Sequence, residues 1–194
     1  MKLIIAGTDI ETTGLLDAEH RIIEVHITRY LVDVAQPEIR DKIDERTWRI
    51  DPERKIPKKS FDVHGICEAD LVGCPTFEKV APEISHYLNE CDIVVAHNGL
   101  EFDFPFLIQE FERVNADVPN FEPMDTMTDG RFATFFGKSP SLKELCFACG
   151  VDYDEDKAHA ADYDVDVMMQ CFFFALARNF YVVPDVVKTA KVSV

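Results

Sequence analysis

The chain has 194 residues, of which 47% are hydrophobic and 29% are charged, as in one soluble globular domain with a substantial core. No apolar run approaches the roughly 20 residues of a membrane helix, and the short apolar stretch near the N-terminus does not suit a secretory signal. We therefore expect a cytoplasmic protein with no membrane partner. The formal net charge of −16 argues against broad electrostatic binding of nucleic acid, because neutralising phosphates needs a basic surface.

The first 50 residues predict three strands. Residues 2–9 are an apolar run, and residues 21–32 alternate with period two, which is typical of a half-buried strand. Residues 45–50 predict a third strand, which ends at Asp51-Pro52 because proline cannot continue a sheet ladder. A loop is expected from there to His64.

The remaining residues predict alternating helices and strands. Helices are expected at 76–88, 101–114, 141–149 and 161–178, and strands at 92–96 and around 124–126. Ser141 caps one helix and Gly150 ends it. These elements predict an α/β fold with a central mixed five-stranded sheet flanked by helices. We expect one domain over residues 1–194, with a core at about 3–178 and an extended tail at 180–194.

Six cysteines lack the dense spacing of a small secreted scaffold, which favours a reducing compartment. The pair Cys146 and Cys149 could be half of a zinc site, but no second pair accompanies it. Two small buried thiols on a short helix are the favoured interpretation.

Asp9 and Glu11 form the first candidate site. Residues i and i+2 of a strand point to the same side, so these two carboxylates lie together at the strand end. Like charges this close repel unless a cation lies between them, and oxygen ligands suit Mg²⁺ or Mn²⁺. Taken alone, however, the pair is better interpreted as a solvated strand end.

Two further carboxylates and a histidine stand at element boundaries. Asp103 lies in the first turn of a predicted helix, just after the strand at 92–96, where α/β sheets usually bind ligands. Asp164 lies near the start of the last helix, and His159 lies in the loop before it. Individually, these are ordinary helix-stabilising carboxylates and an ordinary histidine.

Together and in this order, the segments resemble the DEDDh family of 3′→5′ exonucleases in the ribonuclease-H-like superfamily. That family includes epsilon-like proofreading subunits of bacterial replicative polymerases, ribonuclease T and oligoribonuclease. The matching motifs are Asp-Ile-Glu-Thr-Thr-Gly at 9–14, His-Asn-Gly-Leu-Glu-Phe-Asp at 97–103 and His-Ala-Ala-Asp-Tyr-Asp at 159–164. A sister class has tyrosine four residues before the last aspartate. Ala160 stands there, which favours the histidine class.

The resemblance implies a ribonuclease-H-like fold and a hydrolase that releases 5′-mononucleotides from single-stranded 3′ ends, with DNA as the expected substrate and a DNA polymerase as the expected partner. Two Mg²⁺ (or Mn²⁺) would be held by Asp9, Glu11, Asp103 and Asp164. His159 would be the general base. The implied substrate contacts are Thr12, Leu15, His64, Asn98 and Phe102.

Other interpretations differ in class. An RNA-directed 3′→5′ exoribonuclease stays open, because no residue is identified that reads a 2′-hydroxyl group. An inactive polymerase-associated adaptor with this fold would have lost a ligand, and none of the five core residues is lost. A calcium loop at 152–156 is excluded, because Lys157 and Tyr163 replace the glycine and glutamate that it needs. The sequence does not indicate an oligomeric state.

The segment 46–59 runs against the overall acidity. Its basic residues are Arg46, Arg49, Arg54, Lys55, Lys58 and Lys59. Two interpretations stay open: a solvated loop, or a flank of the substrate groove that binds the strand backbone.

Overall fold

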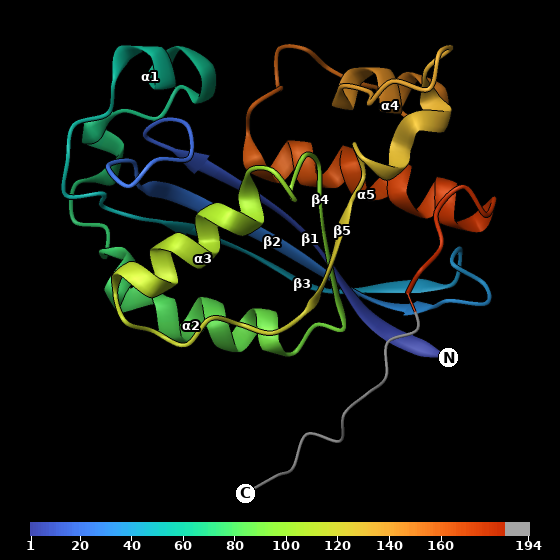
Figure 1. Ribbon diagram of the computed structural model, residues 1–194, viewed down its shortest axis with the longest axis horizontal. Coiled ribbons are helices and arrows are strands. Elements are labelled where there is room, and N and C mark those ends of the chain that lie inside the picture. Colours follow the sequence, from blue (N-terminus) through green and yellow to red (C-terminus); the bar gives the residue numbers. More distant parts are fainter. Residues whose placement is uncertain (185–194) are drawn as a thin grey trace, which may run out of the picture.

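A five-stranded sheet lies between helices on both of its faces in the computed structural model, which describes residues 1–184 (Figure 1). The strands are β1 (Lys2–Thr12), β2 (Ile22–Asp33), β3 (Arg40–Arg49), β4 (Ile93–Ala96) and β5 (Glu122–Asp125). The helices are α1 (Lys58–His64), α2 (Phe77–Asn89), α3 (Asp103–Arg113), α4 (Leu142–Cys149) and α5 (Ala161–Ala177), with 3₁₀ turns η1 (Glu68–Leu71) and η2 (Asp129–Ala133). The predicted mixed sheet flanked by helices is confirmed.

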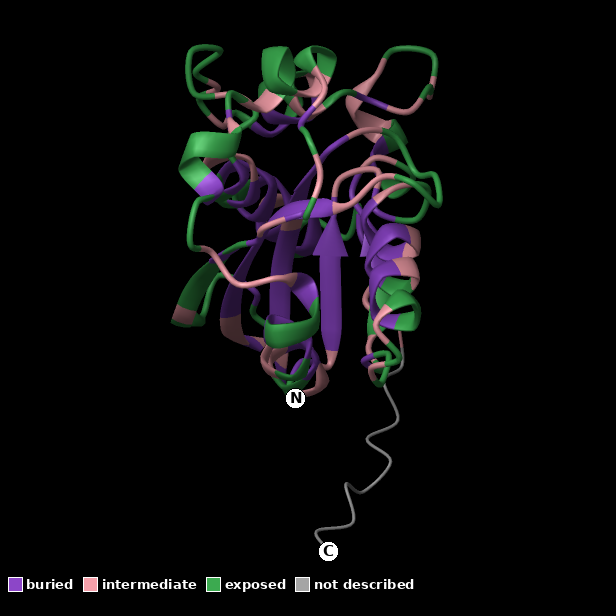
Figure 2. Cartoon of the chain, turned by 90° about the vertical axis from the view of Figure 1, so that its left-hand side faces the viewer, coloured by how far each residue is buried: buried purple, intermediate pink, exposed green. Residues whose placement is uncertain are grey.

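The strand order is β3-β2-β1-β4-β5. β1 pairs antiparallel with β2 and β2 pairs antiparallel with β3, whereas β4 is parallel to both β1 and β5. The carboxyl ends of β1, β4 and β5 therefore meet at one edge of the sheet, which is the usual ligand-binding edge of an α/β fold. Figure 2 shows the buried strands between two helical layers, with exposed loops gathered at the end opposite the N-terminus.

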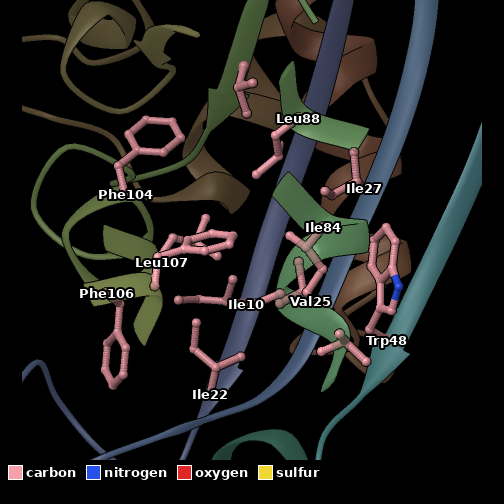
Figure 3. Packing of buried hydrophobic residues seen from close by; sticks show 14 of the residues in the cluster. Ile10, Ile22, Val25, Ile27, Trp48, Ile84, Leu88, Phe104, Phe106 and Leu107 are labelled. Atoms are coloured by element: carbon pink, nitrogen blue, oxygen red, sulfur yellow. The ribbon is translucent and has the colours of Figure 1, made fainter. Parts of the chain in front are cut away.

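The two faces of β1 enter different parts of the core. Ile10 packs with residues of α2 and α3, including Ile84 and Leu107 (Figure 3). Leu3 and Ile5 instead pack with α5. Because side chains alternate along a strand, Asp9 and Glu11 share the face that α5 covers. The hydrophobic pattern of β1 thus decides which helix meets the carboxylates.

Gly7 allows α5 to approach β1 closely. A Cβ atom at this position would lie 2.5 Å from Met169 Cγ and 3.0 Å from Val165 Cγ1 of α5. No side chain larger than hydrogen fits there unless the helix or these side chains move. The glycine therefore helps to set the distance between the start of α5 and the end of β1.

The structure differs from the prediction at three elements. β1 continues to Thr12, so Asp9 and Glu11 lie within the strand. β3 begins at Arg40, although most of its side chains are exposed and its first half shows no apolar alternation. α1 occupies part of the predicted loop before His64, and no residue of this helix is buried. β3 forms because it pairs with β2, and α1 forms in contact with neighbouring loops. Apolar periodicity accounts for neither element.

The predicted buried thiols are confirmed, because Cys146 and Cys149 are both buried on α4. Cys171 of α5 lies beside them, with its sulfur atom 3.6 Å from that of Cys146, and all six cysteines are free. Across residues 1–184, no helix has the length and apolarity that crossing a membrane requires. The part of the predicted tail at 185–194 lies outside the described residues, and the extent of the single domain stays a prediction.

Candidate active site

A pocket of about 550 Å³ lies at the carboxyl edge of β1 and contains all four predicted carboxylates and the histidine. These side chains come from three parts of the chain: Asp9 and Glu11 from β1, Asp103 from α3, and His159 and Asp164 from the start of α5 and the loop before it. The N-terminal ends of α3 and α5 both lie near the arrowhead of β1 in Figure 1. Parallel pairing of β1 with β4 brings α3 to this edge, and packing of α5 on β1 brings the third segment.

The β1 carboxylates repel their neighbours. Burial raises the pKa of Asp9 well above its usual range, and the charges of Asp103 and Glu11 raise it further. Burial, followed by the charge of Glu24 on β2, raises the pKa of Glu11 to about 8. These carboxylates therefore cannot all ionise at neutral pH unless a cation joins them.

Asp103 ties the start of α3 to β1. It is buried, and its Oδ1 accepts a hydrogen bond from the backbone N–H of Ile10 at 3.2 Å. Burial raises the pKa of Asp103, and the backbone hydrogen bonds only partly offset that effect. The helix start is thereby fixed next to the strand that carries Asp9 and Glu11.

Asp164 holds the loop that carries His159. Asp164 Oδ2 accepts a hydrogen bond from the His159 backbone N–H at 3.0 Å. Asp164 Oδ1 is buried and has no hydrogen-bond partner within the described residues. His159 is exposed and has a left-handed φ of 65°, a conformation that non-glycine residues adopt at some cost. Asp164 thus restrains the histidine with one oxygen and leaves the other available to a ligand.

Four of the five predicted substrate contacts line this pocket: Thr12, Leu15, His64 and Phe102. Leu15 is 74% exposed at the pocket, and burial lowers the pKa of His64. Asn98 does not line the pocket. Its backbone has a left-handed φ of 67°, and its N–H donates to Asp125 Oδ1 at 3.0 Å. The role of its side chain stays a prediction.

Asp125 is a positioning residue that the sequence did not reveal. Its buried carboxylate accepts hydrogen bonds from four backbone N–H groups at 2.8–3.2 Å: those of Asn98, Leu100, Met127 and Thr128. It therefore holds the loop before α3 against the loop after β5. The sequence signal was an Asp-Thr pair at a strand end, which does not disclose what the carboxylate binds.

Helix α1 and the residue before it supply a second group of pocket residues. Pro57, Lys59, Ser60 and Val63 all line the pocket, and of these the sequence indicated only Lys59, as one of the basic residues at 46–59. Ser60 Oγ donates to the Thr13 carbonyl oxygen at 2.9 Å and so joins α1 to the end of β1. His97 and His20 also line the pocket. The basic stretch at 46–59 pointed to this region without indicating a helix.

The donor set fits hard divalent cations. All four predicted ligands are carboxylates, which suit Mg²⁺ or Mn²⁺. The unpartnered buried oxygen of Asp164 and the raised pKa values of Asp9 and Glu11 both indicate a site that a cation would stabilise. As the side chains stand, no three acidic, histidine or cysteine residues within 1–184 form a preformed metal cage.

Comparison with known proteins assigns the chain to a family. The family model described as an exonuclease (RNase_T) matches residues 7–172. The chain belongs to this exonuclease family. The chain is 31% identical over 124 residues to DNA polymerase III subunit epsilon of Escherichia coli, which covers 62% of this chain and 50% of that protein. It is 28% identical over 166 residues to the PolC-type DNA polymerase III of Mycoplasma genitalium, which covers 86% of this chain and 11% of that protein. The chain thus spans half or less of these two relatives.

Solved structures of E. coli exonuclease I share the fold. Its complex with a dT13 oligonucleotide aligns with a TM-score of 0.75 at 16% identity, covering 91% of this chain and 42% of that one. A zinc-bound complex with single-stranded DNA gives a TM-score of 0.75 at 18% identity, covering 92% and 41%. The ribonuclease-H-like exonuclease fold that the motifs implied is therefore confirmed.

Proposed function

We propose that this exonuclease-family chain is a metal-dependent 3′→5′ exonuclease that releases 5′-mononucleotides from single-stranded DNA. The observation that carries the proposal is the meeting of four carboxylates and His159 in one pocket, from three separated segments in the DEDDh order. DNA is the preferred substrate because the relatives named above are DNA polymerase III proteins and the structural neighbours include exonuclease I with single-stranded DNA. RNA stays the alternative substrate.

The proposed metal ligands are Asp9, Glu11, Asp103 and Asp164, with two Mg²⁺ or Mn²⁺ as the cofactor. When bound, such ions neutralise the clustered carboxylates and stabilise negative charge that develops on the phosphodiester. The protein contributes the placement of the ligands, since the hydrogen bond from Ile10 to Asp103 and the close packing at Gly7 fix α3 and α5 on β1.

His159 is the proposed general base. An imidazole suits proton transfer near neutral pH, and the exposed position of His159 beside the pocket gives it access to water. It would accept the proton of the water that attacks the terminal phosphodiester. Leu15 and Phe102 offer apolar surface for the terminal base and sugar, and Thr12 contributes to the same wall.

Digestion of a 5′-labelled single strand tests the proposal. With Mg²⁺ we expect a ladder that shortens from the 3′ end and 5′-mononucleotides as the released product. EDTA and Asp9→Asn should each abolish the ladder. Release of 3′-mononucleotides, or full activity of Asp9→Asn, would overturn the assignment. A matched RNA strand in parallel decides between DNA and RNA.

A DNA polymerase is the proposed partner, supported by the names of the relatives. Tethering to a polymerase would raise the effective concentration of the 3′ end at the pocket. Co-elution of the purified chain with the replicative polymerase of its own organism, at micromolar concentration, tests this association.

A further inference from the structure

The pocket is unbalanced in charge. It is lined by four carboxylates, and Lys59 is the only lysine or arginine among its lining residues in the described chain. Bound cations would offset the carboxylates at the scissile linkage, but the next phosphates of the strand also need a partner. We propose that Lys59 binds the backbone phosphate on the 5′ side of the scissile linkage. This inference rests on the proposed nuclease function.

Three of the five other cations in the segment are already paired with the protein's own carboxylates. Within the basic segment 46–59, Arg46 pairs with Glu83, Arg49 with Glu24, and Lys58 with Asp62. Lys59 is exposed and forms no ion pair with any residue in the range 1–184. Its ammonium group is therefore available to a phosphate.

Helix α1 places Lys59 beside the carboxylate strand. The hydrogen bond from Ser60 Oγ to the Thr13 carbonyl oxygen fixes the adjacent residue to the end of β1, and Figure 1 shows α1 beyond the arrowhead of that strand. Lys59 lies in the first turn of α1, which contains no acidic residue. The helix dipole disfavours cations there, so helix stability does not explain this lysine.

The depth of the pocket assigns the phosphate. Asp103 is buried, whereas Lys59 is exposed at the opening. The 3′ end of a strand must reach the buried carboxylates to be cleaved. A cation at the opening therefore contacts a linkage on the 5′ side, which no bound metal ion neutralises.

Lys59→Met tests the assignment in steady-state digestion of a single-stranded oligodeoxynucleotide with Mg²⁺. We expect KM to rise about three- to tenfold with kcat nearly unchanged. The slope of log KM against log salt concentration should fall by about 0.7, which is the value for one phosphate contact on a single strand. Lys59→Arg should restore KM. Lys55→Met is the matched control, because Lys55 is an exposed lysine of the same segment that does not line the pocket. An equal rise in KM for Lys55→Met and Lys59→Met would overturn the assignment.

A neutral linkage identifies the phosphate itself. Oligonucleotides carrying one methylphosphonate, moved stepwise from the linkage 5′ of the scissile bond, remove one charge at a time. With the methylphosphonate at the first position, the KM of the wild type should rise by as much as Lys59→Met raises KM on the natural strand. The KM of Lys59→Met itself should rise little further on this substrate. The proposal would be overturned if the methylphosphonate and Lys59→Met raised KM independently, so that their effects multiplied at every position. An inactive wild type would instead refute the nuclease function on which it rests.

Discussion

We expect single carboxylates in this pocket to favour metal binding at the expense of the stability of the metal-free fold. Burial raises the pKa of Asp164, and one of its oxygens has no partner within the described residues. Asp164→Asn keeps the shape and removes the charge. We expect activity with Mg²⁺ to fall by at least about 10²-fold, while the melting temperature in EDTA stays equal or rises because a buried charge is gone. A large loss of stability in EDTA would show that Asp164 is a structural residue.

His159 should govern proton transfer and little else. We expect His159→Ala to lower kcat by about 10²–10⁴-fold, the usual range for a lost general base, with metal affinity nearly unchanged. His86→Ala is the control, because His86 is an exposed histidine on α2 outside the pocket. The acidic limb of the pH–rate profile should disappear in His159→Ala alone. Its persistence there would assign the base to another group.

Residue types with a chemical signature were predictable, whereas positioning residues were not. The spacing of Asp9 and Glu11 and the order of the later motifs identified the groups that the pocket brings together. Asp125 was not identified as a positioning residue, because it acts by accepting backbone N–H groups from two loops that are joined only in three dimensions. Lys59 was one of six cations in its segment, and it is distinguished by its place in the pocket wall together with the ion pairs that occupy three of its neighbours.

At the level of elements, the contact between β1 and α5 makes a specific prediction at Gly7. A Cβ atom there would lie 2.5 Å from Met169 Cγ, so Gly7→Ala forces the helix or that side chain to move. We expect a loss of about 1–3 kcal/mol in the free energy of unfolding, measured by urea denaturation. Activity should fall as well, since α5 carries Asp164.

Met169→Ala in the Gly7→Ala background provides the control for that prediction. The shorter side chain makes room for the new methyl group, so the double variant should be more stable than the sum of the two single losses allows. Strict additivity would mean that the clash is relieved elsewhere and that Gly7 does not set the helix position.

Elements with a buried stripe were predictable, and exposed elements were not. The helix expected at 141–149 is observed as Leu142–Cys149, with Ser141 and Glu144 forming a capping box and Gly150 at a left-handed φ of 70°. These signals are local, so the sequence contains them in full. α1 buries no residue, and the first half of β3 is polar, so neither has the periodicity on which such predictions depend. α1 nevertheless lines the pocket, so an element that buries no residue can still contribute side chains to the site.

For the whole molecule, the carboxylate cluster should make metal-free stability depend on pH. The pKa of Glu11 is raised from 4.5 to about 8, so the folded state binds more protons than the unfolded state between these values. Its contribution to stability is complete below 4.5 and is lost as pH rises through about 8. Burial lowers the pKa of three histidines, His26, His64 and His97, which acts in the opposite direction below 6.5. The effect of the histidines fades above 6.5, so we expect the carboxylates to dominate the change in stability between pH 6.5 and 8.

Thermal unfolding in EDTA across that window measures the effect. We expect the melting temperature of the wild type to fall from pH 6.5 to 8. The melting temperature of Glu11→Gln should fall less over the same range. Added Mg²⁺ should stabilise the wild type more at pH 8 than at 6.5, because the ligands must be deprotonated to bind it. A flat profile in EDTA, or equal slopes for wild type and Glu11→Gln, would contradict the proposed coupling.

The net charge of −16 predicts that this chain alone degrades strands distributively. Most of the surface repels a polyanion, with a range set by the Debye length of about 10 Å at 0.1 M salt. We expect attraction mainly at the pocket, where bound cations and Lys59 would contact only the terminal linkages. Little therefore holds the shortened strand after each cut, and release should be faster than the next cleavage.

Digestion of a labelled strand, started together with an excess of unlabelled trap, measures this directly. We expect nearly all labelled molecules to lose at most one nucleotide before the trap captures the enzyme. A mixture of intact and fully degraded strands would instead reveal a processive enzyme with a strand-binding surface outside this pocket.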